Sequence, residues 1–168
     1  MTRGERQALI RRYKDGHRAV RAALAGAGPR ELDARPAPGK WTAREIVHHL
    51  ADSEMTAAIR LRRLLAEENP VIQPYDQDEF ARRLHYSRPI AASLAALRAA
   101  RETSAGILDL LTPADWDRAG THPEHGRYTV EKWLTIYAAH AHDHAEQIKR
   151  ARASNPGAKA RRSRRTRG

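Results

Sequence analysis

The sequence has no cysteine among its 168 residues, which excludes disulfides, thiolate metal sites, iron–sulfur clusters and cysteine nucleophiles. It also has no apolar run near the roughly 20 residues that cross a bilayer, and residues 1–12 contain no continuous apolar segment of the kind found in signal peptides. Any bound metal must therefore be held by histidines or carboxylates. These absences lead us to expect a cytoplasmic protein with no membrane contact.

Large apolar side chains are also scarce, because leucine, isoleucine, valine and phenylalanine together supply only 27 residues, while the net charge is +11. Such a composition is typical of disordered chains. Alanine, however, supplies 31 further residues and is the strongest helix former, so alanine-lined helices are expected to pack closely. The last ten residues alone carry a charge of +6. We therefore expect a helical domain over residues 1–154 and a basic, disordered tail over residues 155–168.

Apolar residues recur at helical spacing in four long segments. Helices are expected over residues 4–26, 42–68, 89–111 and 129–154. Thr42 and Thr129 are expected to cap the second and fourth of them. A long irregular crossover with one short helix is expected over residues 68–87, and a polar connection over residues 120–126. With no alternating β pattern, the sequence predicts an all-α fold, a four-helix bundle with one long crossover.

The histidines form the most informative pattern. His140 and His144 are four residues apart in the last predicted helix, so both imidazoles lie on its apolar side, whereas His142 points away toward water. Two unpartnered imidazoles inside a bundle are costly, and a bound cation removes that cost. Hydrogen-bonded core histidines are the alternative. In the second helix, periodicity weakly favours His49 over His48 as a third ligand, because His49 lies nearer the apolar edge.

Other patterns are less informative. Glu45 and His48 form an ExxH pair, but a di-iron bundle needs a second such pair and two further inward carboxylates, and the sequence has no second ExxH. The zincin motif HExxH is excluded because Ala141 stands where that motif has glutamate. Trp41 and Trp133 are expected to fill the core rather than to contact a ligand.

Four separate segments resemble the DinB/YfiT-like family in their order and spacing. They are WTAREIVHHLADSE at residues 41–54, Arg60, Pro74-Tyr75-Asp76, and YAAHxxxHxxQI at residues 137–148. The resemblance spans roughly residues 35–150 and is lost mainly in the basic tail and at residues 122–126. It implies an up-down-down-up four-helix bundle and a homodimer. It also implies one divalent metal, zinc or nickel first, held by three histidines: His49, His140 and His144.

Three protein ligands leave a coordination position open, as in catalytic rather than structural sites. A divalent ion makes a bound water or thiol lose its proton more readily. The resemblance favours transfer of a low-molecular-weight thiol, such as bacillithiol or mycothiol, to a small electrophile. The alternative is hydrolysis of an ester-like or phosphoryl substrate by metal-bound hydroxide. A metal with a purely structural role is a further possibility, and no residue is assigned a catalytic role beyond metal binding.

Four residues are candidates for orienting the imidazoles or contacting the substrate. Asp52 and Gln147 each lie about one turn beyond a metal-ligand candidate of the same helix. The alternative for Asp52 is a solvated position on the helix surface. Tyr75 and Asp76 lie in the crossover, where they either line the mouth of a pocket or form a turn fixed by Pro74.

The basic tail suggests a different class of function. Clustered arginines gain affinity for nucleic acid by neutralising phosphates, and such binding weakens as salt rises. The tail has no interleaved aromatic residues and no base-reading motif. It is therefore expected to give only weak, non-specific nucleic-acid contact, secondary to the metal chemistry.

Overall fold

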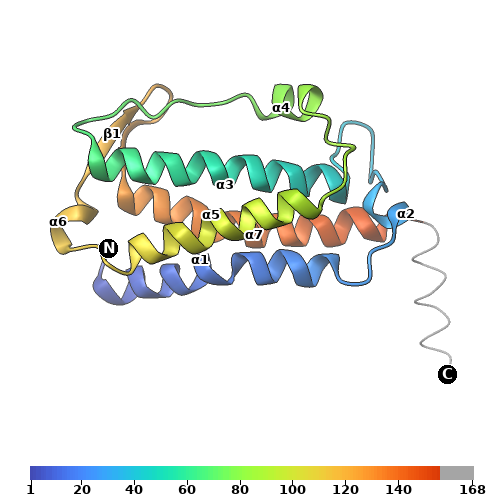
Figure 1. Cartoon of the computed structure of the whole chain (residues 1–168), viewed down its shortest axis with the longest axis horizontal. Coiled ribbons are helices and arrows are strands. Elements are labelled where there is room, and N and C mark those ends of the chain that lie inside the picture. The colour runs from blue at the N-terminus through green and yellow to red at the C-terminus, as the bar shows by residue number, and fades with distance from the viewer. Residues whose placement is uncertain (156–168) are drawn as a thin grey trace.

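The computed structural model describes residues 1–155, in which four long helices form a bundle with short helices and a hairpin at its ends (Figure 1). The elements in chain order are α1 (Arg3–Leu24), α2 (Pro29–Leu32), α3 (Ala43–Ala66), α4 (Gln77–Arg83), α5 (Ala91–Leu108), α6 (Pro113–Trp116), β1 (Ala119–His122), β2 (Gly126–Thr129) and α7 (Val130–Ala153). None of these helices is long and apolar enough to cross a bilayer. The predicted tail lies, apart from Asn155, outside the described residues.

Two of the long helices, α3 and α7, begin at the threonine caps that the sequence predicts. The Thr42 hydroxyl accepts a hydrogen bond from the backbone N–H of Glu45, and the Glu45 carboxylate accepts one from the backbone N–H of Thr42. Thr129 caps α7 by accepting from the backbone N–H of Lys132. These bonds satisfy N–H groups that have no partner inside the helix, and each such cap stabilises its helix by about 1 kcal/mol.

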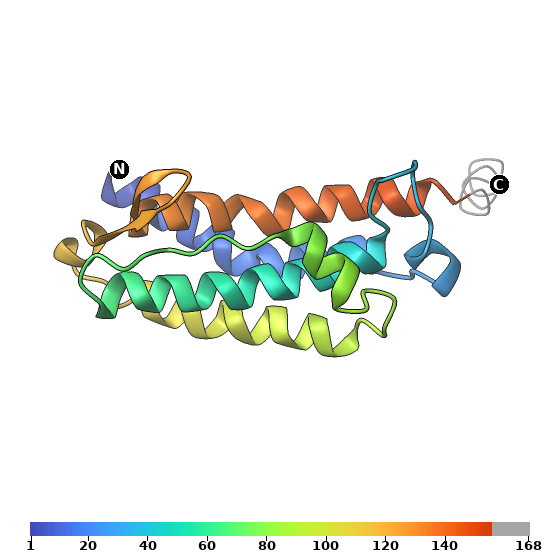
Figure 2. The same ribbon diagram turned by 90° about the horizontal axis from the view of Figure 1, so that it is seen from above.

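The direction of the helices confirms the up-down-down-up order. Helices α1 and α7 run one way along the bundle, and α3 and α5 run the other way (Figures 1 and 2). Because α3 and α5 are parallel, the chain between them must return along the whole bundle. It does so as the crossover of residues 67–90, which follows α3 and includes α4 (Figure 2).

The hairpin formed by β1 and β2 corrects the expectation of an irregular polar connection. The strands pair antiparallel from Ala119 opposite Thr129 to His122 opposite Gly126. Four-residue strands are too short for alternation to be recognised in the sequence. Tertiary contacts hold the hairpin instead, because the crossover pairs with it: the Thr121 N–H donates to the Pro70 carbonyl at 2.9 Å, and the Ile72 N–H donates to the Thr121 carbonyl at 2.9 Å.

Two apolar clusters fill the bundle. One surrounds the fully buried Trp133, whose indole N–H donates to the Ala57 carbonyl at 2.8 Å, so Trp133 belongs to the core as expected. The other contains Leu50 and Leu97. A buried polar layer lies between the two clusters.

That layer is an ion pair between Glu54 of α3 and Arg101 of α5, 2.6 Å apart and almost completely buried. The Tyr13 hydroxyl donates to the other Glu54 oxygen at 2.5 Å. Arg101 also donates to the backbone carbonyls of Tyr13 and Tyr137. A glycine makes room for the guanidinium, since a Cβ at Gly16 would lie 2.6 Å from an Arg101 nitrogen.

Candidate metal centre

Three histidines from two helices face one another inside the bundle. His140 and His144 lie one turn apart on α7, with their Nε2 atoms 3.1 Å apart. The ring of His49, on α3, lies 4.8 Å from that of His144 and 5.4 Å from that of His140, between centroids. One nitrogen of each ring lies within 4.8 Å of the other two. The structure therefore brings together the three residues that the sequence analysis selected as metal ligands.

Burial keeps these imidazoles neutral. Burial, with a smaller contribution from the neighbouring imidazole of His144, lowers the pKa of His49 to about 3 and that of His140 to about 2. Burial also lowers the pKa of His144, against the opposing effect of its hydrogen bond to Gln147. Neutral imidazole is the form that binds metal, so no proton has to be displaced at neutral pH.

The donor set fits a divalent ion. The Nδ1 atoms of His49 and His140 are buried and have no hydrogen-bond partner among the described residues. In the ring of His140 it is Nε2 that faces the other imidazoles, 3.1 Å from Nε2 of His144. An ion between the rings accepts one lone pair from each of them, and three imidazoles suit zinc, nickel, cobalt, copper or iron.

Gln147 orients one of the three rings. Its side-chain oxygen accepts a hydrogen bond from Nδ1 of His144 at 2.7 Å. This fixes the proton of His144 on Nδ1 and leaves the Nε2 lone pair facing His140. The structure thus places Gln147 beside the ring that the sequence analysis expected it to orient.

Replacing Gln147 with leucine is expected to weaken metal binding by roughly 10- to 100-fold, because the His144 ring loses the acceptor that fixes its tautomer. Competition with a chromophoric chelator measures the affinity. Gln147→Glu keeps an acceptor oxygen and is expected to bind metal like the parent. Equal affinity of the leucine variant and the parent would show that Gln147 does not orient the ring.

Asp52 lies in a different environment from either expectation. It is buried, with 9% exposure, so the alternative of a solvated position does not hold. Its carboxylate accepts a hydrogen bond from the Tyr86 hydroxyl at 2.6 Å. Burial and this carboxylate raise the pKa of Tyr86. Asp52 thereby ties α3 to the chain that leads into α5.

The two candidate residues of the crossover, Tyr75 and Asp76, contact different parts of the structure. The Tyr75 ring is half-buried, with its centroid 6.0 Å from the guanidinium carbon of Arg60. Burial raises the pKa of Tyr75, and the Arg60 charge opposes this. The Asp76 carboxylate instead accepts from the backbone N–H groups of Asp78 and Glu79, at 2.9 and 3.0 Å, and caps α4. The crossover thus brings Tyr75 to α3, whereas Asp76 serves the short helix.

Trp41 and His48 lie near the three histidines, and the structure shows the surroundings of each. Trp41, expected in the core, is half-buried, and its ring lies 4.8 Å from the ring of His49. His48 is fully buried, and its two nitrogens lie 2.7 Å from the Ser93 hydroxyl and 3.0 Å from the Arg88 carbonyl. Both nitrogens of His48 are therefore engaged in linking α3 to the start of α5. Trp41 directly precedes Thr42, the N-cap of α3, and this position in the sequence could have placed its ring at the start of that helix.

A second group of possible ligands lies at the hairpin turn, where His122, Glu124 and His125 offer atoms within 4.8 Å of one another. Its geometry is less suited to a metal. Nδ1 of His122 already accepts a hydrogen bond from the Glu124 backbone at 3.2 Å, and the two imidazoles are stacked at 4.6 Å. Two of the three residues are exposed. The group is therefore not part of the candidate metal centre.

Comparison with known proteins identifies the family and the fold of this chain. The profile of the DinB superfamily matches residues 12–148. A protein of Oceanobacillus iheyensis is 42% identical over 118 residues, which cover 70% of this chain and 69% of that protein. One of Bacillus mycoides is 33% identical over 119 residues, which cover 71% and 69%. Both are named "putative metal-dependent hydrolase". The chain belongs to the DinB superfamily.

A solved structure shows the same architecture. YfiT from Bacillus subtilis matches with a TM-score of 0.83 and 29% sequence identity, over 88% of this chain and 86% of that one. It is described as "a probable metal-dependent hydrolase with an unusual four-helix bundle topology". The resemblance to the DinB/YfiT-like family and the four-helix bundle expected from it are both confirmed.

Proposed function

We propose that this protein is a metal-dependent hydrolase whose divalent ion is held by His49, His140 and His144. The observation that carries the proposal is the convergence of three neutral imidazoles, two of them with Nε2 atoms 3.1 Å apart, in a group that has no fourth ligand among residues 1–155. Three ligands leave a position for a reacting molecule. The names of the relatives from Oceanobacillus iheyensis and Bacillus mycoides support hydrolysis as the reaction.

A divalent ion in such a site supplies Lewis acidity and lowers the pKa of a bound water or thiol. The protein's own side chains orient the imidazoles and surround them. Gln147 holds the His144 ring in orientation, and Trp41 covers His49 on one side. The Tyr137 ring lies 6.0 Å from the His140 ring, and its hydroxyl accepts from Arg60. These side chains are available to bind and orient an ester-like substrate beside the histidines.

Thiol transfer uses the same three histidines and is the second form of the proposal. It rests on the family resemblance, which favours a low-molecular-weight thiol and a small electrophile as partners. Because the relatives are named hydrolases, hydrolysis now stands first. Zinc or nickel as the metal, the homodimer and the weak nucleic-acid contact of the tail stay predictions.

The test uses the full chain purified without a histidine tag, stripped of metal and reloaded with zinc or nickel. We expect metal-dependent hydrolysis of p-nitrophenyl esters or phosphodiesters without added thiol. His140→Ala is expected to lower kcat/KM by more than roughly 100-fold, and His142→Ala to leave it unchanged. Turnover of an electrophile only in the presence of bacillithiol or mycothiol would replace hydrolysis by thiol transfer. Absence of metal-dependent turnover in both assays would overturn the proposal.

A further inference from the structure

Among the described residues, no carboxylate pairs with the positive charge of Arg60 on α3. One terminal nitrogen donates to the Tyr137 hydroxyl at 3.1 Å, and the other donates to the Gln73 carbonyl of the crossover. Within residues 1–155 its guanidinium forms these two hydrogen bonds and no ion pair. Its Nε–H is buried and has no partner in the same part of the chain. A guanidinium has five N–H donors, so most of this group's capacity to bind an anion is unused.

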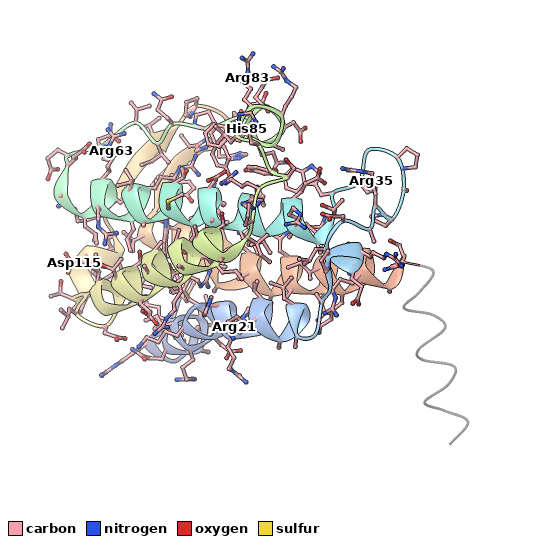
Figure 3. All side chains as sticks on the ribbon, turned by 45° about the vertical axis from the view of Figure 1, so that its right-hand side comes forward. Arg21, Arg35, Arg63, Arg83, His85 and Asp115 are labelled. Carbon is pink, nitrogen blue, oxygen red and sulfur yellow. The ribbon has the colours of Figure 1, made fainter. Side chains whose placement is uncertain are left out.

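Holding the crossover in place does not explain an arginine without a carboxylate. Arg63, one turn further along α3, also donates to a crossover carbonyl, that of Val71, at 2.8 Å. It is paired with the Glu67 carboxylate at 2.8 Å and lies close to the start of the crossover (Figure 3). The two arginines share the structural task, but only Arg63 is neutralised. The unpaired charge of Arg60 therefore points to a ligand.

The position of Arg60 ties that ligand to the metal centre. Arg60 follows His49 by eleven residues on α3, and side chains lean toward the start of their own helix, so its guanidinium lies back toward His49. Tyr137 spans the remaining gap, because its hydroxyl contacts Arg60 while its ring lies 6.0 Å from the His140 ring. The Tyr75 ring of the crossover also lies near this arginine, with its centroid 6.0 Å from the Arg60 guanidinium carbon. Arg60 is partly exposed and so within reach of solvent.

We propose that Arg60 forms an oxyanion subsite, which binds a carboxylate or phosphate group of the substrate while the reacting bond lies at the three histidines. An oxyanion accepts hydrogen bonds from the remaining N–H groups of the planar guanidinium in a fixed geometry. The substrate is then an anionic small molecule with an ester-like bond a short distance from its charged group. The identification of this anion as part of a substrate rests on the proposed hydrolase function, whereas anion binding itself requires no metal.

The first experiment measures anion binding to the metal-free full chain. Acetate and inorganic phosphate are titrated separately while the arginine Nε–H resonances are followed by NMR. Arg60→Lys identifies the Arg60 signal by its disappearance. We expect that signal to shift with a saturable dependence on one of the two anions, and the tighter anion distinguishes a carboxylate from a phosphate substrate. If no arginine Nε–H of the parent shifts with either anion, the subsite does not exist.

Matched variants separate this subsite from general attraction to a chain with net charge +11. Arg60→Gln and Arg63→Gln each remove one charge and one contact to the crossover. Arg60→Gln is expected to weaken binding of the selected anion by roughly 10- to 100-fold, and Arg63→Gln by less than about twofold. Equal effects of the two changes would overturn the proposal, because binding would then depend on overall charge.

The second experiment compares the metal-loaded parent and Arg60→Gln on two esters that differ only in a free or a capped anionic group. We expect kcat/KM to fall roughly 10- to 100-fold for the charged ester and less than about threefold for the capped one. Anion binding at Arg60 without hydrolysis of either ester would keep the subsite and reject the hydrolase. Hydrolysis without preference for the charged ester would reject Arg60 as a substrate-binding residue.

Discussion

Replacing His140 with alanine is expected to reduce bound metal from about one ion per chain to none that survives desalting. The two remaining imidazoles come from different helices and leave the ion held largely by solvent. His49→Ala and His144→Ala are expected to have the same effect, since each ring supplies one of the three converging nitrogens. Elemental analysis of untagged protein, loaded with zinc or nickel and then desalted, measures the stoichiometry.

His142→Ala is the matched control because it changes the same residue type on the same helix. The helical spacing in the sequence predicted that His142 faces water. The structure corrects this: the ring is half-buried against α1, with Nε2 2.9 Å from the Arg12 carbonyl, because α1 packs along α7. His142 still points away from the triad, so the ion is expected to remain in this variant. Loss of the ion from His142→Ala, or its retention in His140→Ala, would show that the ligands are assigned wrongly.

Replacing Glu54 with leucine is expected to lower the free energy of unfolding by about 3–5 kcal/mol. The change leaves the buried Arg101 guanidinium without its carboxylate and the Tyr13 hydroxyl without its acceptor. Burial raises the pKa of Glu54, and the Arg101 charge opposes this, so the Glu54 carboxylate depends on Arg101 to remain charged in the core. Urea denaturation of the metal-free protein measures the loss.

Two further variants show whether the unpaired charge causes this loss. Glu54→Leu combined with Arg101→Met leaves no buried charge, and most of the lost stability is expected to return. Arg98→Ala removes an exposed pair with Glu102 on the same helix, 2.7 Å apart, and is expected to leave stability unchanged within error. A double variant as unstable as Glu54→Leu would mean that packing volume, and not charge, sets the effect.

Much of the fold follows from local rules that the sequence alone determines. The four long helices arise from apolar spacing and alanine content, and Thr42 and Thr129 begin two of them because their hydroxyls cap free N–H groups. The third helix begins later than expected, at Ala91 instead of residue 89, and Ile90 stands at its N-cap without a side-chain hydrogen bond. The hairpin was missed because its pairing depends on Pro70 and Ile72, some fifty residues earlier in the chain.

The candidate metal centre, too, was predictable from local sequence only in part. The pairing of His140 and His144 is local, because a separation of four residues places both rings on one side of any helix. The choice of His49 over His48 is not local. It depends on how α3 is rotated against its neighbours, which turns His49 toward α7 and His48 toward Ser93 of α5. Periodicity favoured His49 only weakly because neither histidine lies within the apolar stripe, and His49 is only the nearer of the two to its edge.

The sequence by itself therefore determined the helices, the caps and the HxxxH half of the site. The tertiary structure decided the partners of side chains on different helices: Trp41 against His49, Tyr86 against Asp52, and Arg60 between Tyr137 and the crossover. It also decided that Glu54 meets Arg101 in the core. The physical reason is that the spacing along one helix fixes only the side on which a residue lies. What it meets there depends on the rotation of the neighbouring helix and on the path of the loop that covers both.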